Sequence, residues 1–182
     1  NRFLEKNTKL NLSAIRTAED VYAKHIQDAL AIQDVVSFEA GSQIADLGTG
    51  WWFPLLPLAI ENPKCYFVGI DARKKKTIAV QEIADDLWLS NVTLVRTRIE
   101  EHRKKYDYVT VRAVAYSDKL LDRSTPLLKP YGKMILYKRR DKEEKKVLLK
   151  SAKKNWFKLI NEHHYQLFDG DIERVIYVLE KL

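Results

Sequence analysis

Short apolar runs alternate with amphipathic stretches along most of the chain. From residue 43 on, several runs have the length of buried strands, and the segment 74–88 between two of them has its apolar residues at helical spacing. The pattern predicts strands over 44–47, 65–70, 92–95, 108–111, 133–137, 158–167 and 174–180, with helices over 74–88, 117–128 and 141–155. The last two strands flank a turn at Asp169-Gly-Asp171, which is short enough to make them antiparallel.

This order of elements predicts an α/β three-layer sandwich around a seven-stranded mixed sheet whose last strand is antiparallel. We expect a single domain over residues 1–182, with a helical N-terminal cap over 1–40 and the core over 41–182. In the cap, His25 and Asp28 are three positions apart and share a helix face. They form either a polar pair beside a pocket or a local hydrogen bond that fixes the helix.

The first predicted strand of the core ends in the segment Asp46-Leu-Gly-Thr-Gly50. A Gly-x-Gly turn between a strand and a helix allows the backbone to approach a nucleotide-like ligand closely. The second strand ends on Asp71, about twenty positions on, where such folds place an acidic partner for ribose hydroxyls. We therefore expect Asp46 and Asp71 to end adjacent strands. The alternative is a structural turn that binds no ligand.

The net charge of the 182 residues is +7, and the basic residues form clusters after predicted strands. Each phosphate contact releases counterions, so such clusters suit a polyphosphate partner such as RNA. The alternative is a solvated basic surface. The residues expected to bind RNA are Arg73, Lys74, Lys75, Lys76, Lys138, Arg139 and Arg140.

The use of cysteine and histidine argues against several classes of protein. Cys65 is the only cysteine, so no disulfide framework exists and a reducing, cytoplasmic location is expected. One cysteine and scattered histidines lack the spacing of a zinc site, and no metal is expected. The longest apolar run, 51–60, contains two prolines and is half as long as a membrane span, and nothing resembles a signal peptide. We therefore expect no membrane association.

Several segments, in their order along the chain, are similar to motifs of one family. They are Asn11–Ile15, Lys24–Leu30, Asp46–Gly50 followed by Phe53-Pro54 and Pro57–Ala59, Asp71 with Lys74–Lys76, Arg98–Glu101, Arg112–Ala115, and Gly132-Lys133 with Tyr137-Lys138. Together they resemble the bacterial guanine-N7 methyltransferases of small-subunit ribosomal RNA, also called glucose-inhibited division protein B. The resemblance implies the class I methyltransferase (Rossmann-like) fold and S-adenosylmethionine as the cofactor.

The resemblance also implies which residues bind the cofactor. They are Gly48, Gly50 and Phe53 at the methionine end, Asp71 at the ribose hydroxyls, Ile99 and Glu100 at the adenine, and Arg112 beside the cofactor near the target base. Two of these positions have structural alternatives. Asp71 is also suited to cap the following helix, and Arg112 is suited to pair with Glu100 or Glu101.

Methylation at N7 of guanine requires few catalytic groups. N7 carries a free lone pair and loses no proton, so no general base is needed and the rate comes mainly from alignment of the reacting atoms. We therefore assign no catalytic residue. The implied partner is ribosomal RNA or a small ribosomal subunit precursor, and the protein is expected to be a monomer. A small-molecule methyltransferase is a further alternative, against which the basic surface argues.

The chain departs from the resembled family at four positions. Val111 and Ala29 replace serines, and Trp51 and Trp52 stand in a loop that is usually small. Position 52 is normally a third glycine, so its indole is expected to pack on the cap, to occupy the space of the methionine moiety, or to lie over the site and stack on the target guanine. We expect weaker cofactor binding than in a double-glycine variant. The alternative function is an RNA-binding protein of methyltransferase fold with weakened or lost cofactor binding.

Overall fold

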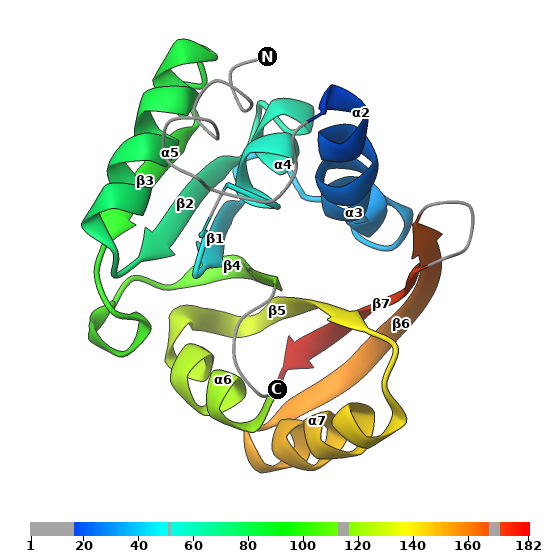
Figure 1. Cartoon of the computed structure of the whole chain (residues 1–182). Coiled ribbons are helices and arrows are strands. Elements are labelled where there is room, and N and C mark those ends of the chain that lie inside the picture. The colour runs from blue at the N-terminus through cyan, green and yellow to red at the C-terminus, as the bar shows by residue number, and fades with distance from the viewer. Residues whose placement is uncertain (1–16, 51, 113–116, 168–171) are drawn as a thin grey trace.

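The computed structural model describes residues 17–50, 52–112, 117–167 and 172–182. Its centre is a seven-stranded sheet in the order β3-β2-β1-β4-β5-β7-β6 (Figure 1). The strands are β1 (Gln43–Leu47), β2 (Tyr66–Asp71), β3 (Val92–Arg96), β4 (Tyr106–Arg112), β5 (Leu128–Arg139), β6 (Phe157–Leu167) and β7 (Ile172–Lys181). Strands β1 to β5 pair in parallel, and β7 runs antiparallel to β5 and β6. The predicted mixed sheet with an antiparallel last strand is confirmed.

Helices cover both faces of this sheet (Figure 1). One face carries α2 (Ala18–Val21), the π-helix η1 (Tyr22–Ile26), α3 (Gln27–Leu30), the 3-10 helix η2 (Ala31–Asp34), α4 (Leu55–Glu61) and α5 (Lys74–Asp86), and the other carries α6 (Ser117–Ser124) and α7 (Lys142–Lys154). Two buried apolar clusters, one under each helical layer, form the core. The described cap is the segment from α2 to η2, and residues 1–16 of the predicted cap lie outside the described residues.

The helices follow their apolar spacing with one exception. In α5, Val80, Ile83 and Ala84 form the buried stripe that the spacing predicts. The prediction of one helix over 117–128 is wrong at its end, because α6 stops at Ser124 and a 3-10 helix, η4 (Thr125–Leu127), follows. Pro126 lacks the N–H group that a continued α-helix needs. The chain then enters β5 at Leu128.

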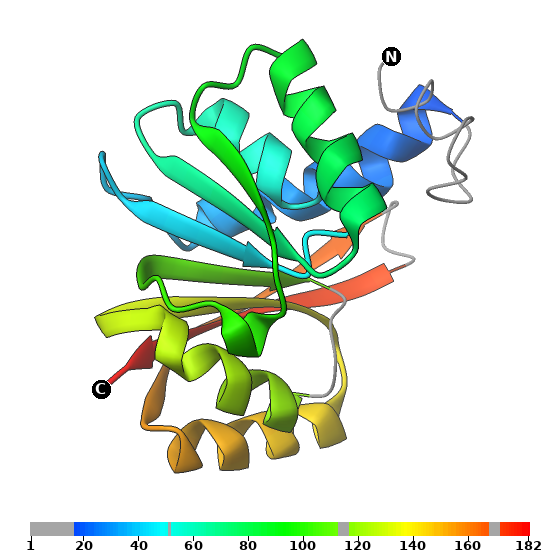
Figure 2. The same ribbon diagram turned by 90° about the vertical axis from the view of Figure 1, so that its left-hand side faces the viewer.

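The strand directions give the sheet two distinct edges. Strands β1 to β6 end at one edge, called here the carboxyl edge, and β7 ends at the opposite, amino edge. Figure 2 shows the sheet from the side, with the C terminus at the amino edge on the left. The predicted turn at residues 169–171 lies outside the described residues. In the part of the chain that the structure describes, no helix is long and apolar enough to cross a membrane.

Candidate cofactor and RNA site

Two glycines shape the loop after β1. Gly48 and Gly50 have φ angles of 66° and 54°, in the left-handed region that glycine enters without steric cost. The N–H of Gly48 donates to the carbonyl oxygen of Ile70 at 2.8 Å, which ties the loop to the end of β2. A Cβ atom at Gly50 would lie 3.3 Å from the carbonyl oxygen of Gly48, so a side chain here would crowd the loop.

Asp71 faces this loop from the end of β2. Its Oδ2 accepts a hydrogen bond of 3.2 Å from the N–H of Gly50, and its Oδ1 accepts one of 2.8 Å from the N–H of Arg73. The N-cap of α5 is Arg73, so Asp71 is not the capping residue that the structural alternative required. Because β1 and β2 are neighbours, Asp46 and Asp71 lie at the ends of adjacent strands, as predicted.

Asp46 is a buried carboxyl group at the start of the glycine loop. Thr110 of β4 donates to its Oδ1 at 2.9 Å, whereas Oδ2 accepts no hydrogen bond from the described part of the chain. Burial raises the pKa of Asp46 to about 7, although its hydrogen bonds and the charge of Arg112 act in the opposite direction. A buried carboxyl group with one unsatisfied oxygen is suited to receive a donor or a cation from a ligand. From the sequence, Asp46 is predicted only to end a strand.

The cap holds Arg112, which ends β4. Its Nε lies 2.7 Å from Oδ2 of Asp28, and its Nη2 lies 3.2 Å from Nδ1 of His25. Asp28 is only 1% exposed and also accepts a hydrogen bond of 2.5 Å from the hydroxyl of Tyr165. The polar pair His25 and Asp28 therefore joins the cap to the carboxyl edge of the sheet.

The two residues expected at the adenine lie on the 3-10 helix η3 (Ile99–Glu101), which follows β3. Ile99 is partly buried against the apolar cluster on the α6 side. The carboxylate of Glu100 lies 3.0 Å from Nε of Arg123 in α6, whereas Arg112 contacts Asp28 and His25. Both residues follow a strand that ends at the carboxyl edge, the same edge as the glycine loop.

Phe53 and Trp52 connect the glycine loop to the cap. The ring of Phe53 stacks on His25 with 4.7 Å between ring centroids, and the guanidinium carbon of Arg112 lies 6.0 Å from the Phe53 centroid. Trp52 has a φ of 69°, is only 4% exposed, and belongs to the buried cluster that includes apolar residues of the cap. Burial in this cluster agrees with packing on the cap, which is one of the three placements considered for this indole and stays a prediction. Trp51 lies outside the described residues.

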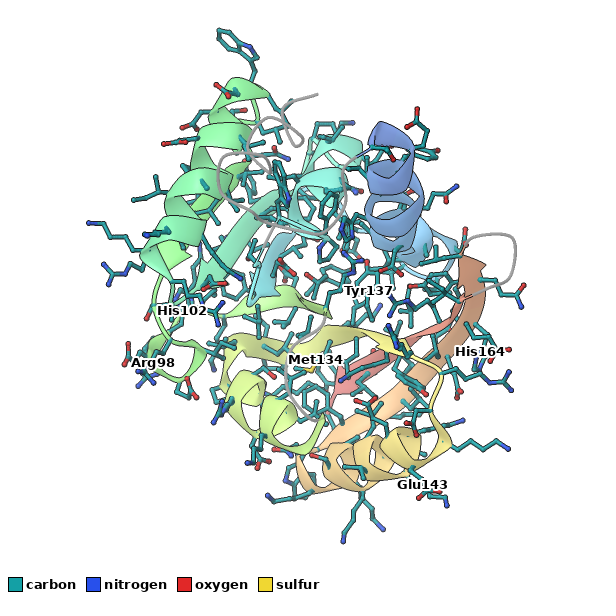
Figure 3. The ribbon with its side chains drawn as sticks, in the orientation of Figure 1. Arg98, His102, Met134, Tyr137, Glu143 and His164 are labelled. Atoms are coloured by element: carbon teal, nitrogen blue, oxygen red, sulfur yellow. The ribbon has the colours of Figure 1, made fainter. Side chains whose placement is uncertain are left out.

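The basic residues at the end of β5 lie at the same edge. Lys138 pairs with Glu144 at 2.7 Å and Arg140 pairs with Glu173 at 3.2 Å, while Arg139 is exposed. A pocket of about 290 Å³ opens beside them and is lined by Arg140, His164, Tyr165, Gln166, Glu173 and Arg174. Figure 3 labels His164 on β6. In the other predicted cluster, Nζ of Lys76 lies 3.8 Å from the place that a Cβ of Gly50 would take. Lys76 thus lies at the glycine loop.

Three residues that the sequence analysis did not select hold the cap on the sheet. The hydroxyl of Tyr137 donates to the carbonyl oxygen of Ala29 at 2.8 Å, and Figure 3 shows Tyr137 beside the cap helices. Tyr165 donates to Asp28, and Nε of Arg174 lies 3.8 Å from Oδ1 of the same carboxylate. The two tyrosines are 108 and 137 positions from their partners, so no local spacing signals these contacts.

The described histidines and carboxylates do not form a metal site. Among the residues that the structure describes, no group of three or more His, Cys, Asp or Glu side chains is arranged to hold a metal ion. His102 lies 2.7 Å from the hydroxyl of Tyr106, and His163 and His164 each pair with a carboxylate. These contacts are structural.

Comparison with known sequences identifies the family. The family model of GidB, described as rRNA small subunit methyltransferase G, matches residues 1–175. The chain belongs to this family. The resemblance that its motifs show is therefore confirmed, and so is the class of enzyme that the resemblance implies.

Two curated relatives of this GidB-family chain carry the name ribosomal RNA small subunit methyltransferase G. The one from Deinococcus deserti is 38% identical over 140 residues, which cover 74% of this chain and 57% of the relative. The one from Listeria welshimeri is 32% identical over 185 residues, which cover 98% of this chain and 78% of the relative. The chain thus spans little more than half of the Deinococcus protein and about four fifths of the Listeria protein.

Solved structures share the fold at low sequence identity. A SAM-dependent methyltransferase from Aquifex aeolicus superposes with a TM-score of 0.68 at 17% identity, covering 97% of each chain. TrmN from Thermus thermophilus has a TM-score of 0.65 at 22% identity, covering 86% of this chain and 48% of TrmN. These similarities confirm the Rossmann-like methyltransferase fold.

Proposed function

We propose that this chain transfers the methyl group of S-adenosylmethionine to N7 of a guanine in small-subunit ribosomal RNA. The observation that carries the proposal is the contact between the N–H of Gly50 and the carboxylate of Asp71, beside the buried Asp46. At this contact, a backbone segment that a ligand can approach closely lies beside two carboxyl groups, at one edge of a methyltransferase fold. The family to which the chain belongs supplies the class of RNA.

The residues at this edge fit the cofactor. Gly48 and Gly50 themselves carry no side chain where the methionine end would lie, and the carboxylate of Asp71 is an acceptor for ribose hydroxyls. The unsatisfied Oδ2 of Asp46 is a further acceptor, and it is suited to a positively charged ligand. Ile99 and Glu100 frame the adenine in this proposal.

Alignment is the main task of the protein in this reaction. When bound, S-adenosylmethionine would supply an electrophilic methyl group on a sulfonium. Its transfer to the lone pair of guanine N7 would break the S–CH3 bond, release S-adenosylhomocysteine and require no loss of a proton. We assign Arg112 to the target base, because its guanidinium is held by Asp28 and His25 and guanine presents the acceptor O6 next to N7. Fixing the base in line with the methyl group is where such a site gains rate.

An RNA-binding protein without cofactor binding is the less favoured candidate. The glycine loop and Asp71 are both present, and the indole of Trp52 lies in the apolar cluster below the cap. The basic residues Lys138, Arg139 and Arg140 serve the RNA in both candidates, together with the cluster from Arg73 to Lys76. Cofactor binding is therefore the property that separates the two.

Calorimetric titration with S-adenosylmethionine tests the proposed site. We expect Asp71→Ala to weaken binding by about tenfold or more, because a hydrogen bond to a charged group contributes about 1.5–3 kcal/mol. Asp85→Ala is the control, since Asp85 is an exposed aspartate at the far end of α5. Equal affinity of the Asp71→Ala variant and the parent chain would remove Asp71 from the site.

A further inference from the structure

Four exposed aromatic residues lie at the amino edge, opposite the proposed cofactor site. Tyr66 begins β2 and is 60% exposed, and the other three are the most exposed aromatic residues that the structure describes. Trp88 precedes β3, Tyr131 lies near the start of β5, and Trp156 immediately precedes β6. Their exposed fractions are 92%, 73% and 74%, so the rings cover no core. A single exposed ring on a protein surface needs no explanation.

The backbone conformation at Trp88, Tyr131 and Trp156 does need an explanation. Trp88, Tyr131 and Trp156 have φ angles of 57°, 60° and 60°, the left-handed conformation that glycine and asparagine adopt with less strain. The only other non-glycine residue with a positive φ among the described residues is Trp52. Its indole is buried, and burial accounts for a large apolar side chain at this position. Neither burial nor backbone preference explains the three exposed rings.

Two of these rings are presented by a fixed backbone. Tyr131 lies in a bulge of β5, and a Cβ at the next residue, Gly132, would lie 2.9 Å from the carbonyl oxygen of Lys129. The carbonyl oxygen of Trp156 accepts a hydrogen bond of 2.8 Å from the N–H of Leu182. Strands β5 and β6 are separated only by β7, so about 10 Å of sheet width lies between the two rings.

The charge around these rings differs along the edge. Between β4 and β6 the amino edge is rich in lysine, and these residues are Lys104, Lys105, Lys129, Lys133, Lys153, Lys154, Lys158 and Lys181. The carboxylates of this part are Asp107 and Asp122, which pair with Lys129 and Lys154, Glu180, which lies between two lysines in the sheet register, and Glu39, which lines a pocket with Lys129, Tyr131 and Lys133. Trp88 instead follows Asp85 and Asp86 at the end of α5.

We propose that Tyr131, Trp156 and the lysines around them form a second RNA-binding surface, which holds a single-stranded segment of the RNA away from the target guanine. Rings of this kind stack on bases without sequence preference, and lysines follow the phosphates. Positive charge favours RNA over a second copy of this basic chain. The inference rests on the proposed function for the identity of the partner. Beyond that function, it specifies the face of the protein along which the RNA extends from the methylated nucleotide.

Asparagine variants test this surface without disturbing the fold. Tyr131→Asn combined with Trp156→Asn removes both rings and suits the left-handed backbone, so the thermal midpoint should stay equal or rise. The double variant should bind in vitro transcribed small-subunit ribosomal RNA, and a single-stranded oligouridylate, about tenfold or more weakly than the parent chain. Trp88→Asn is the matched control, and its RNA affinity should stay within about twofold of the parent value.

Three readouts keep the outcomes separate. If the parent chain binds neither RNA, the proposed function fails. If the parent chain binds RNA and the double variant binds it equally well, only the second surface is overturned. A change in sedimentation of the double variant with unchanged RNA affinity also overturns it, because the rings would then join copies of the chain. Titration with S-adenosylmethionine should give the same affinity for all variants.

Discussion

Arg112 at the end of β4 lies 2.7 Å from Asp28 of α3, and both side chains are largely shielded from solvent. Tyr165 from β6 donates to the same carboxylate, and Nε of Arg174 from β7 lies 3.8 Å from it. Asp28 therefore ties the cap to three strands of the sheet, beside the loop that we assign to the cofactor. Removing one partner of such a pair leaves a charge that is buried without compensation.

Asp28→Asn should lower the free energy of unfolding by about 3–5 kcal/mol, because Arg112 keeps its charge and loses its carboxylate. Urea denaturation measures the difference. Lys146→Gln is the control, since the pair of Lys146 with Glu143 is exposed on α7 and its loss should cost at most about 1 kcal/mol. Equal effects of both substitutions would show that Asp28 contributes no more than a surface charge.

Asp46 makes the stability depend on pH in a specific direction. Its pKa is raised to about 7, mainly by burial, so ionisation of this group opposes folding. Below the unfolded pKa both states hold the proton and Asp46 has no effect. As the pH rises from about 4 to about 7, the unfolded state loses the proton first and the folded state becomes less stable, by up to about 1.4 kcal/mol per pH unit.

Asp46→Asn removes this dependence. The free energy of unfolding of the variant, relative to the parent chain, should therefore increase between pH about 4 and pH about 7 and then stay constant. Denaturation curves collected across this range measure it. A constant difference over the whole range would mean that Asp46 ionises normally in the folded protein.

Arg139 is an exposed cation at the end of β5, whereas Lys138 is held by Glu144 and Arg140 by Glu173. Arg139→Gln should weaken binding of small-subunit ribosomal RNA and reduce the slope of log affinity against log salt by about 0.7–0.9, the contribution of one phosphate contact. Lys138→Gln should change the slope less. An unchanged slope for Arg139→Gln would exclude Arg139 from the RNA contact.

The effect of Trp51 and Trp52 on cofactor affinity stays a prediction. The sequence predicts that a chain with Trp51→Gly and Trp52→Gly binds S-adenosylmethionine more tightly than the parent chain, because position 52 normally holds a glycine. Calorimetric titration of both proteins measures this, with Trp88→Gly as a control for the loss of an indole. Equal affinities would show that the buried indole of Trp52 leaves the cofactor loop free.

The sequence predicts the frame of the molecule well because that frame follows from local patterns. Apolar runs between turn residues mark all seven strands. The spacing from Gly48 to Asp71 indicates that the glycine loop contacts the carboxylate at the end of β2. Contacts between distant segments leave no such pattern. The carboxylate of Asp28 that holds Arg112, and the hydroxyl of Tyr165 beside it, are brought together only by the packing of the cap on the sheet.

The end of α6 at Ser124 could be read from the sequence, because Pro126 cannot continue an α-helix. The start of β5 at Leu128 could not, because it depends on the pairing of Leu128 with Tyr106 in another strand. Trp52 is buried in a cluster whose members come from the cap, α4, β2 and β5, so no local pattern places its indole.

The most direct measurement is transfer of a labelled methyl group from S-adenosylmethionine to RNA. The purified chain is incubated with small ribosomal subunits or their ribosomal RNA, and the product is digested to nucleosides. We predict one labelled product, N7-methylguanosine, formed by the parent chain and reduced strongly in the Asp71→Ala variant. Label in another nucleoside, or no label with RNA and cofactor both bound, would contradict the proposed function.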